Sequence, residues 1–232
     1  MAGKYSKLLI VGSGSGLSAS LARLFSREGL KIALAARNVD KLGALCSATG
    51  ASAFACDAAD PTQVEQLFDA VENQMGPPDV VIFNAGARTR GPLVSLDARD
   101  VETAIRVSAF AGFLVGQQAA RRMVPQRHGA IFFTGAPASV KGYPQSAPFA
   151  MGKFALRGLA QSMARELAPL GIHVAHFIIA GAIRNPGRTE AADSPDSLLD
   201  PDAIAASYLH VLGQHRSAWT WEMELRPWVE EF

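Results

Sequence analysis

The first residues of this chain whose spacing suggests a binding site are three closely spaced glycines, which directly follow an apolar segment. Residues 8–11 (LLIV) have the composition of a buried strand, residues 12–17 read GSGSGL, and helical periodicity follows. Glycines let the backbone turn sharply and approach a phosphate closely, and the N-terminus of a helix offers free N–H groups and a positive dipole end. The loop therefore predicts a phosphate-binding site, with a simple tight turn between strand and helix as the alternative.

A basic residue follows the second apolar segment. Residues 32–35 predict a second strand, and Ala36, Arg37 and Asn38 come next. An acidic residue at this point of a dinucleotide site binds the ribose hydroxyls of NAD, whereas Arg37 suits the additional phosphate of NADP through forked, charge-assisted hydrogen bonds. A solvated arginine at a strand end is the alternative. We expect NADP(H) to be the preferred cofactor, with NAD(H) possible.

Apolar segments of strand length alternate with helical periodicity along the chain, and residues 184–200, rich in Pro, Ser, Asp and Gly, predict a loop or lid. The predicted strands are 8–11, 32–35, 52–55, 80–83, 130–133 and 174–179, with an alternating segment at 217–225 as the last. The predicted helices are 17–28, 61–73, 97–123, 149–167 and 201–212. Continuous apolar strands separated by helices indicate an α/β protein with a parallel sheet covered on both faces.

Composition excludes several classes of protein. A chain of 232 residues with 49% hydrophobic and 19% charged residues is globular and suits one domain. A net charge of +1 gives no reason to expect a nucleic-acid partner. Cys46 and Cys56 have neither metal-like nor disulfide-like spacing, so we expect reduced thiols and no metal site. The polar first seven residues and the lack of a long apolar run predict a cytoplasmic protein without a membrane contact.

Several short motifs together resemble the classical short-chain dehydrogenase/reductase (SDR) family. The glycine spacing at 12–16, Asn-Ala-Gly at 84–86, Gly-Tyr-Pro at 142–144 and Lys-Phe-Ala-Leu at 153–156 match that family in order and spacing, and the resemblance extends from Lys7 to about Trp221. It implies a single doubly wound Rossmann domain over residues 1–232, with a parallel sheet of about seven strands. It also implies hydride transfer between a nicotinamide and a small-molecule carbonyl or alcohol.

The resemblance also assigns cofactor contacts. Asp57 matches the residue that contacts the adenine, and Ile183 is the candidate for the nicotinamide amide contact, after Ala180 in place of the family's proline. Ser18 stands where the family usually has the third glycine of the loop. The predicted cofactor-binding residues are Gly12, Ser13, Ser15, Gly16, Leu17, Arg37, Asp57, Ala58, Asn84, Ala85, Gly86, Lys153 and Ile183.

The catalytic positions depart from the family pattern. In the family a Tyr transfers the proton, a Ser binds the substrate oxygen, an Asn holds a water, and a Lys binds the nicotinamide ribose and lowers the pKa of the Tyr. Here the first three positions hold Phe149, Ala136 and Ser108, and Lys153 alone is retained. A phenylalanine ring cannot transfer a proton. Tyr143 is the candidate substitute donor, with a half-buried loop aromatic as the alternative.

Three functions fit this pattern. The first is an NADP(H)-dependent oxidoreductase of the short-chain type with an altered proton donor. The second is a catalytically silent NADP(H)-binding homologue that acts as a sensor or scaffold, and the third is an interaction protein that has lost the nucleotide, against which the intact glycine loop argues. The resemblance and the small residues of the helices at 97–123 and 149–167 predict a homodimer or homotetramer built through a four-helix interface.

Overall fold

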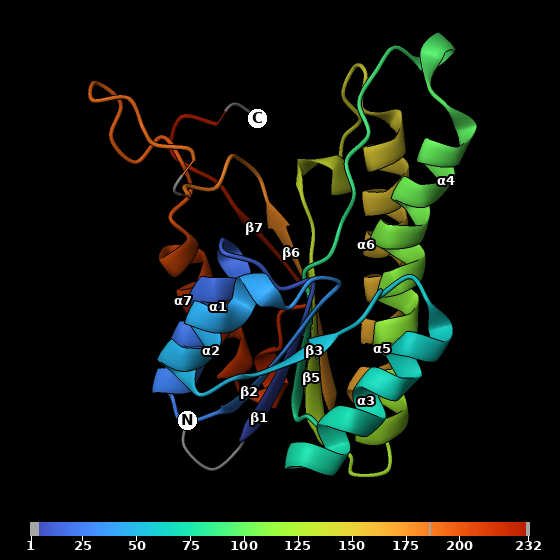
Figure 1. Ribbon diagram of the computed structural model, residues 1–232, viewed down its shortest axis with the longest axis vertical. Helices are drawn as coiled ribbons and strands as arrows, with labels where there is room; N and C mark the ends of the chain where they lie inside the picture. Colours follow the sequence, from blue (N-terminus) through green and yellow to red (C-terminus); the bar gives the residue numbers. More distant parts are fainter. Residues whose placement is uncertain (1–4, 186, 231–232) are drawn as a thin grey trace.

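Seven parallel strands form one sheet in the order β3-β2-β1-β4-β5-β6-β7 in the computed structural model, which describes residues 5–185 and 187–230 (Figure 1). Residue 186 of the predicted lid and the two ends of the predicted domain lie outside the described residues. The strands are β1 Lys7–Val11, β2 Lys31–Ala36, β3 Ser52–Ala55, β4 Val80–Phe83, β5 Gly129–Thr134, β6 Ile172–Ile179 and β7 Glu222–Leu225. The predicted doubly wound, seven-stranded parallel sheet is confirmed.

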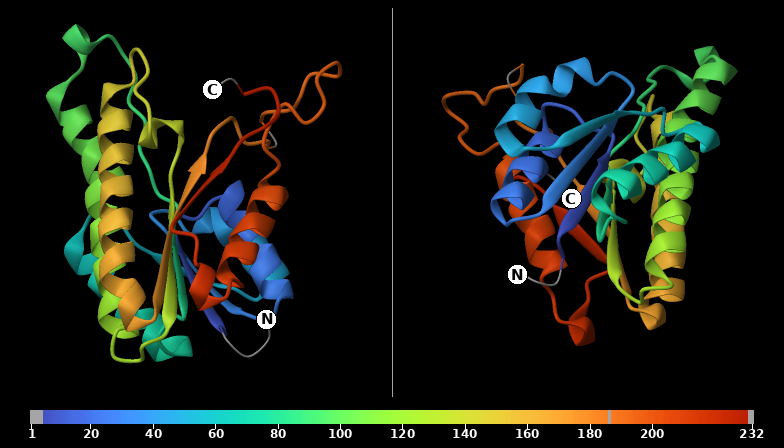
Figure 2. Two further views of the ribbon diagram at one scale, coloured as in Figure 1. Left: turned by 180° about the vertical axis from the view of Figure 1, so that it is seen from behind. Right: turned by 60° about the horizontal axis from the view of Figure 1, so that its bottom comes forward.

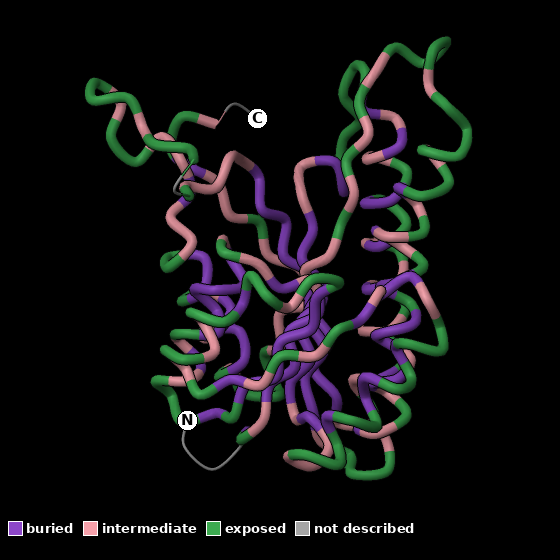
Figure 3. The backbone as a smooth tube through the Cα atoms, viewed as in Figure 1, coloured by how far each residue is buried: buried purple, intermediate pink, exposed green. Residues whose placement is uncertain are grey.

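Helices cover both faces of the sheet, as Figure 2 shows. The helices are α1 Leu17–Arg27, α2 Gly43–Thr49, α3 Pro61–Met75, α4 Ala98–Ile105, α5 Ala111–Met123, α6 Ala147–Leu167 and α7 Pro201–Leu212. One apolar core joins the sheet to α1 and α7, and a second core joins its other face to α3, α5 and α6. Every residue of β4, β5 and β6 is therefore buried, which is the purple centre of Figure 3. This explains why these strands read as continuous apolar segments.

The helices of the structure differ from the prediction in three places. The predicted helix at 97–123 is divided by a π-helical turn, Arg106–Phe110, which separates α4 from α5. Helix α6 begins two residues before the predicted Phe149, because Pro148 fits a first helical turn, where its missing N–H is not needed. Helix α2 was not predicted, since this seven-residue helix buries no residue and so leaves no apolar stripe in the sequence.

The predicted last strand is shorter than expected. Only Glu222–Leu225 pairs with β6, while Arg216–Ala218 forms a short 3-10 turn. The alternation before Glu222 arises instead from Trp219, whose ring stacks on that of His173 with centroids 4.7 Å apart. An aromatic side chain that covers a buried strand gives the same pattern of residues as a strand does.

The sheet brings the ends of distant strands together. Strand β1 pairs with β2 on one side and β4 on the other, so the chains leaving β1 and β4 diverge and open a crevice at this switch point. The turn after β1 fits closely here: Gly12 has φ +92°, and a Cβ added to it would lie 2.5 Å from the backbone nitrogen of Ala85. Glycine is therefore required at position 12.

The loops that follow β4, β5 and β6 all lie at the C-terminal ends of the strands, which is the upper end of the sheet in Figure 1. None of the helices in the part of the chain described above has both the length and the apolar character needed to span a bilayer.

Candidate active site

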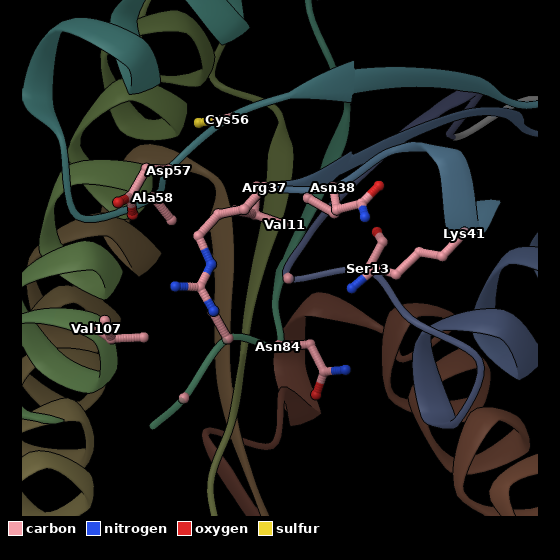
Figure 4. Close-up of a pocket in the computed structure, with 14 residues that line it drawn as sticks. Val11, Ser13, Arg37, Asn38, Lys41, Cys56, Asp57, Ala58, Asn84 and Val107 are labelled. Carbon is pink, nitrogen blue, oxygen red and sulfur yellow. The ribbon is translucent and has the colours of Figure 1, made fainter. Parts of the chain in front are cut away.

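A cavity of about 570 Å³ lies at the switch point between β1 and β4 (Figure 4). Its wall contains eight of the predicted cofactor-binding residues: Gly12, Ser13, Arg37, Asp57, Ala58, Asn84, Ala85 and Gly86. Ser15 lines a smaller neighbouring cavity of about 240 Å³ that also contains Gly14 and Lys41. Gly16 and Leu17 form the beginning of α1 beside these cavities. The structure thus gathers residues from four loops around one space large enough for a nucleotide.

The first part of the glycine loop is held by its own backbone. The N–H groups of Gly12 and Ser13 both donate to the carbonyl oxygen of Ala35, at 3.0 and 2.9 Å, and the hydroxyl of Ser13 donates to the carbonyl of Ile10. These bonds attach the loop to β1 and β2. A phosphate in this loop would therefore be met by the later backbone N–H groups and by the positive end of α1, which begins at Leu17.

Ser18, at the position of the family's third glycine, connects the two sides of the crevice. The side-chain amide of Asn84 donates to Ser18 Oγ at 2.7 Å, and that hydroxyl donates to the carbonyl oxygen of Gly12 at 3.1 Å. Asn84 follows β4, whereas Gly12 follows β1. The serine therefore stabilises the relative position of the two loops that line the cavity.

Two cations line the end of the cavity beside β2. Figure 4 shows the Arg37 side chain extending into the cavity, with Lys41 and Asn38 nearby. Lys41 belongs to a short 3-10 turn, Asp40–Leu42, and sequence reasoning missed it because it lies outside the strand-end motif. Among the residues described for this wall, Asp57 is the one acidic side chain, and its Oδ1 accepts from the N–H of Ala59 in its own turn. This donor set fits the extra phosphate of NADP.

Lys153 lies between this cavity and a second one. It is almost fully buried, and its Nζ donates to the carbonyl oxygen of Thr134 at 2.8 Å. Burial lowers the pKa of Lys153 to about 8. Gly86 belongs to the wall of the first cavity, and a Cβ added to it would lie 3.5 Å from the Nζ of Lys153. Phe149 belongs to the wall of the second cavity, and the centroid of its ring lies 5.9 Å from the same Nζ.

The second cavity, of about 590 Å³, brings together the ends of the loops after β4, β5 and β6. Three predicted catalytic positions, Ala136, Tyr143 and Phe149, lie in its wall. The guanidinium of Arg88 also lies 5.2 Å from the centroid of the Phe149 ring, so the position assigned to the family's proton donor is filled by an aromatic ring that has two cations within 6 Å of its centroid. Tyr143 is 39% exposed, and among the described residues of this wall it is the one tyrosine.

Two other predicted residues lie outside both cavity walls. Ser108 is buried in the π-helical turn, and its Oγ accepts from the N–H of Ala87 at 3.3 Å. It packs closely against α6, where a Cβ added to Gly152 would lie 2.7 Å from the Cβ of Ser108. Ile183 forms a parallel bridge with Leu199 and packs against the core. Ser108 therefore supports the loop after β4, and Gly181 and Ala182 rather than Ile183 reach the second cavity.

A buried polar network behind the second cavity was missed by sequence reasoning. His176 Nδ1 lies 3.1 Å from Glu222 Oε2, and His176 Nε2 lies 3.4 Å from the Oγ of Ser139. Arg157 donates to both oxygens of Glu222, at 2.6 and 2.7 Å. Burial lowers the pKa of His176 to about 4, against the opposing charge of Glu222.

The protonation of this network follows from its charges. Burial alone would raise the pKa of Glu222, but the hydrogen bonds and the charge of Arg157, together with the hydrogen bond from His176, outweigh it and lower that pKa, so the carboxylate is ionised. A neutral His176 then donates through Nδ1 to Glu222 and accepts through Nε2 from Ser139. Ser139 in turn accepts from the N–H of Ala136 at 3.2 Å. His176 therefore holds, through Ser139, the loop that contains Ala136.

Comparisons with known proteins agree with this geometry. The model of the short chain dehydrogenase family matches residues 6–195. The chain is 30% identical over 173 residues to gluconate 5-dehydrogenase of Gluconobacter oxydans, which is 72% of this chain and 68% of that protein. The crystal structure of a short-chain dehydrogenase from Rhodopseudomonas palustris superposes with a TM-score of 0.83 at 36% identity, covering 96% of this chain and 99% of that one.

The fold alone also matches a more distant solved structure. A variant of actinorhodin polyketide ketoreductase with NADPH superposes with a TM-score of 0.86 at 21% identity, over 98% of both chains. The family model covers most of the present chain, and the sheet order and the two cavities on either side of Lys153 are consistent with it. The chain therefore belongs to the short-chain dehydrogenase family of NAD(P)-dependent oxidoreductases.

Proposed function

We propose that this protein is an NADP(H)-dependent oxidoreductase that acts on the carbonyl or alcohol group of a small molecule. The observation that carries the proposal is the position of Lys153, whose buried ammonium lies between the switch-point cavity and the second cavity. In this arrangement the first cavity binds the dinucleotide and the second binds the substrate. When bound, the nicotinamide supplies or accepts the hydride.

The preference for NADP(H) is supported by the charges at the end of β2. Arg37 and Lys41 line the same cavity, and their combined charge favours a phosphate over ribose hydroxyls. The bound NADPH in the distant ketoreductase structure is consistent with this assignment. NAD(H) would bind the same crevice without the contact to these two side chains, and therefore more weakly.

Side chains of the protein bind the cofactor and transfer the proton. Lys153, whose Nζ lies next to Gly86 in the wall of the cofactor cavity, binds the nicotinamide ribose. Tyr143 transfers the proton from the wall of the substrate cavity. Arg188, in the segment predicted as a lid, contributes to the wall of this second cavity. Loss of the usual donor costs about 10²–10⁴-fold in rate, which a phenol placed elsewhere in the same wall can partly restore.

The test is oxidation of NADPH with a panel of ketones and aldehydes. We expect turnover that falls by roughly 10²–10⁴-fold in Tyr143→Phe while NADPH affinity is unchanged. Tyr5→Phe would be a poor control because Tyr5 is buried, so the control is Ser47→Ala, which removes a hydroxyl from the exposed surface of α2, outside both cavities. Turnover that is unaffected by Tyr143→Phe would contradict the assignment of this phenol as donor.

A second function is favoured by one observation, the contact of the Phe149 ring with both Arg88 and Lys153. A ring in contact with both cations fills the position of the family's proton donor. A homologue that binds NADP(H) and serves as a sensor would need no donor at this point. NADPH that binds tightly and is not consumed with any carbonyl compound would support this second function.

The assembly we propose is a dimer or tetramer through α4, α5 and α6. Four large apolar side chains on these helices and on the π-helical turn are 40–51% exposed: Phe110, Phe113, Met151 and Phe154. The rings of Phe110 and Phe113 also stack, with centroids 6.3 Å apart. An exposed apolar surface of this kind is typical of a protein interface.

A further inference from the structure

Three arginines line the second cavity, and the sequence motifs do not account for any of them. Arg88 and Arg90 lie on the loop after β4, and Arg188 lies on the loop after β6. The remaining wall is made of apolar and uncharged side chains, apart from Glu230. With three positive charges and one negative charge, the described wall carries a net charge of +2.

The two loops approach the cavity from opposite sides. Figures 1 and 2 show the loop after β4 beside α4 and α6, and the loop after β6 on the side of α7. Each is held in place by backbone hydrogen bonds: the N–H of Gly91 donates to Gln145, and the backbones of Asn185 and Arg188 exchange two bonds, at 3.2 and 2.9 Å. The arginines therefore lie on two loops that line a common cavity.

These guanidinium groups are available to a ligand. Within residues 5–185 and 187–230, no carboxylate lies within ion-pair distance of Arg88, Arg90 or Arg188. All three residues are exposed and line the cavity. Like charges that face one cavity repel each other, so the unliganded arrangement is unfavourable and an anion between them would relieve it.

The electrostatics of Arg88 agree with this geometry. Partial burial lowers its pKa, and the charges of Arg90 and Arg188 lower it further. Arg88 also lies over the ring of Phe149, which fixes one face of its guanidinium and leaves the edge with its N–H donors for a partner. A planar donor edge of this kind matches the oxygens of a carboxylate or phosphate.

We propose that the second cavity binds a substrate with a carboxylate or phosphate group, held by Arg88, Arg90 and Arg188, with its carbonyl or alcohol carbon toward Lys153. The identification of the bound molecule as the substrate rests on the proposed function, whereas the anion site rests on the cavity alone. The site is distinct from the phosphate contacts of the cofactor, because Arg37 and Lys41 line the other cavity.

The test compares three aryl ketones that differ only in the group opposite the carbonyl: 4-acetylbenzoate, 4-acetylphenyl phosphate and the neutral 4-acetylbenzamide. Each is titrated by calorimetry into the protein saturated with NADP⁺, which cannot reduce a ketone and which occupies the cofactor's own phosphate site. We expect at least one anionic ketone to bind roughly 10- to 100-fold more tightly than the amide. The preference between carboxylate and phosphate identifies the natural anion.

The variants Arg88→Gln, Arg90→Gln and Arg188→Gln should each remove a large part of this preference, and Glu230→Gln should increase it. The control is Arg27→Gln, an exposed arginine of α1 that lines neither cavity, which should leave the preference unchanged. Binding of the anions should also weaken as the salt concentration rises.

The outcomes separate the two proposals. Equal affinity for the amide and both anions, or an anion preference that persists in all three arginine variants, would overturn the anion site. Tight, arginine-dependent binding of an anionic ketone without any oxidation of NADPH in parallel assays would uphold the anion site and contradict the reductase function. Oxidation of NADPH together with equal affinities for the amide and both anions would uphold the reductase function and contradict the anion site.

Discussion

The ring of Phe149 lies with its centroid 5.9 Å from the Nζ of Lys153, four residues further along α6. Residues four apart on a helix share one face, so the lysine retains the geometry in which it would face a hydroxyl on residue 149. That ammonium is buried and bound to the carbonyl of Thr134, and is therefore already positioned. The scaffold for a tyrosine at this site remains, while the proton-transferring group does not.

The double variant Phe149→Tyr, Ala136→Ser should raise carbonyl reduction. The added phenol would lie beside an ammonium that lowers its pKa, and the added hydroxyl would face the same cavity. We expect a gain that approaches the 10²–10⁴-fold contribution typical of general acid catalysis, measured as NADPH oxidation with a ketone panel. The two single variants serve as controls and should gain less. A loss of activity in the double variant, with NADPH still bound, would indicate a pocket rebuilt for other chemistry.

Arg37→Ala should lower the affinity for NADPH and leave that for NADH nearly unchanged. The guanidinium extends into the cavity beside Lys41, where only the 2′-phosphate of NADPH would engage it. Loss of one charge-assisted contact costs about 1.5–3 kcal/mol, or roughly 10- to 100-fold in Kd. Calorimetric titration of both cofactors measures this, with Lys41→Ala expected to have a smaller effect in the same direction. Equal affinities for NADPH and NADH in the unmodified protein would refute the assignment.

Sequence reasoning located the fold and most of the residues that line the switch-point cavity, because both depend on local patterns. Strands such as Val80–Phe83 are apolar throughout, since helices cover both faces, and the loop at 12–17 carries its own glycine signature. Lys41 was missed because its role depends on where a short turn folds relative to Arg37.

The second cavity and its supports could not be predicted in the same way. Arg88 and Arg188 are 100 positions apart, and only the sheet order brings the loops after β4 and β6 to one space. The same applies to His176 and Glu222, which pair across the register of β6 and β7. An isolated arginine or histidine has no spacing that indicates its partner.

NADPH affinity should depend on pH through Lys153. Its pKa of about 8 lies below the ordinary 10.5 because burial disfavours the charged form. Below pH 8 the ammonium is present with or without the anionic cofactor, so the affinity is constant. Above pH 8 the free protein loses the charge, binding must recover the proton, and the affinity should fall by at most tenfold per pH unit. Titrations between pH 7 and 10 test this, and Lys153→Met should bind more weakly with a flat profile.

Replacing Phe113 with glutamate should dissociate the proposed oligomer. Phe113 is 41% exposed and stacks with Phe110 on the same surface, so a charge there would be buried without a partner in a four-helix interface. Light scattering at micromolar concentration should give a multiple of the 24.5 kDa chain for the unmodified protein and the monomer mass for the variant. Trp228→Glu, which replaces a more exposed aromatic side chain near the C-terminus, is the control and should leave the mass unchanged. A monomeric unmodified protein would contradict the interface.

His176 should make the protein less stable as the pH falls from 6.5 toward 4. Its pKa is lowered to about 4 in the folded state, mainly by burial, whereas the unfolded chain titrates near 6.5. Between these values the unfolded state binds a proton that the folded state does not, so the free energy of unfolding is fully retained above pH 6.5 and decreases below it. The decrease should reach roughly 2–3 kcal/mol near pH 4.5.

Urea unfolding of the protein and of His176→Gln at several pH values between 4.5 and 7 measures this dependence. Glutamine keeps a donor toward Glu222 and an acceptor toward Ser139 but does not titrate, so the variant should lose most of the slope while Glu222 remains ionised over this range. His210→Gln, on the exposed face of α7 and outside the network, is the control and should keep the slope. If His176→Gln retains the full slope, the proton is taken up elsewhere, and the neutral, Nδ1-protonated histidine inferred for this network is wrong.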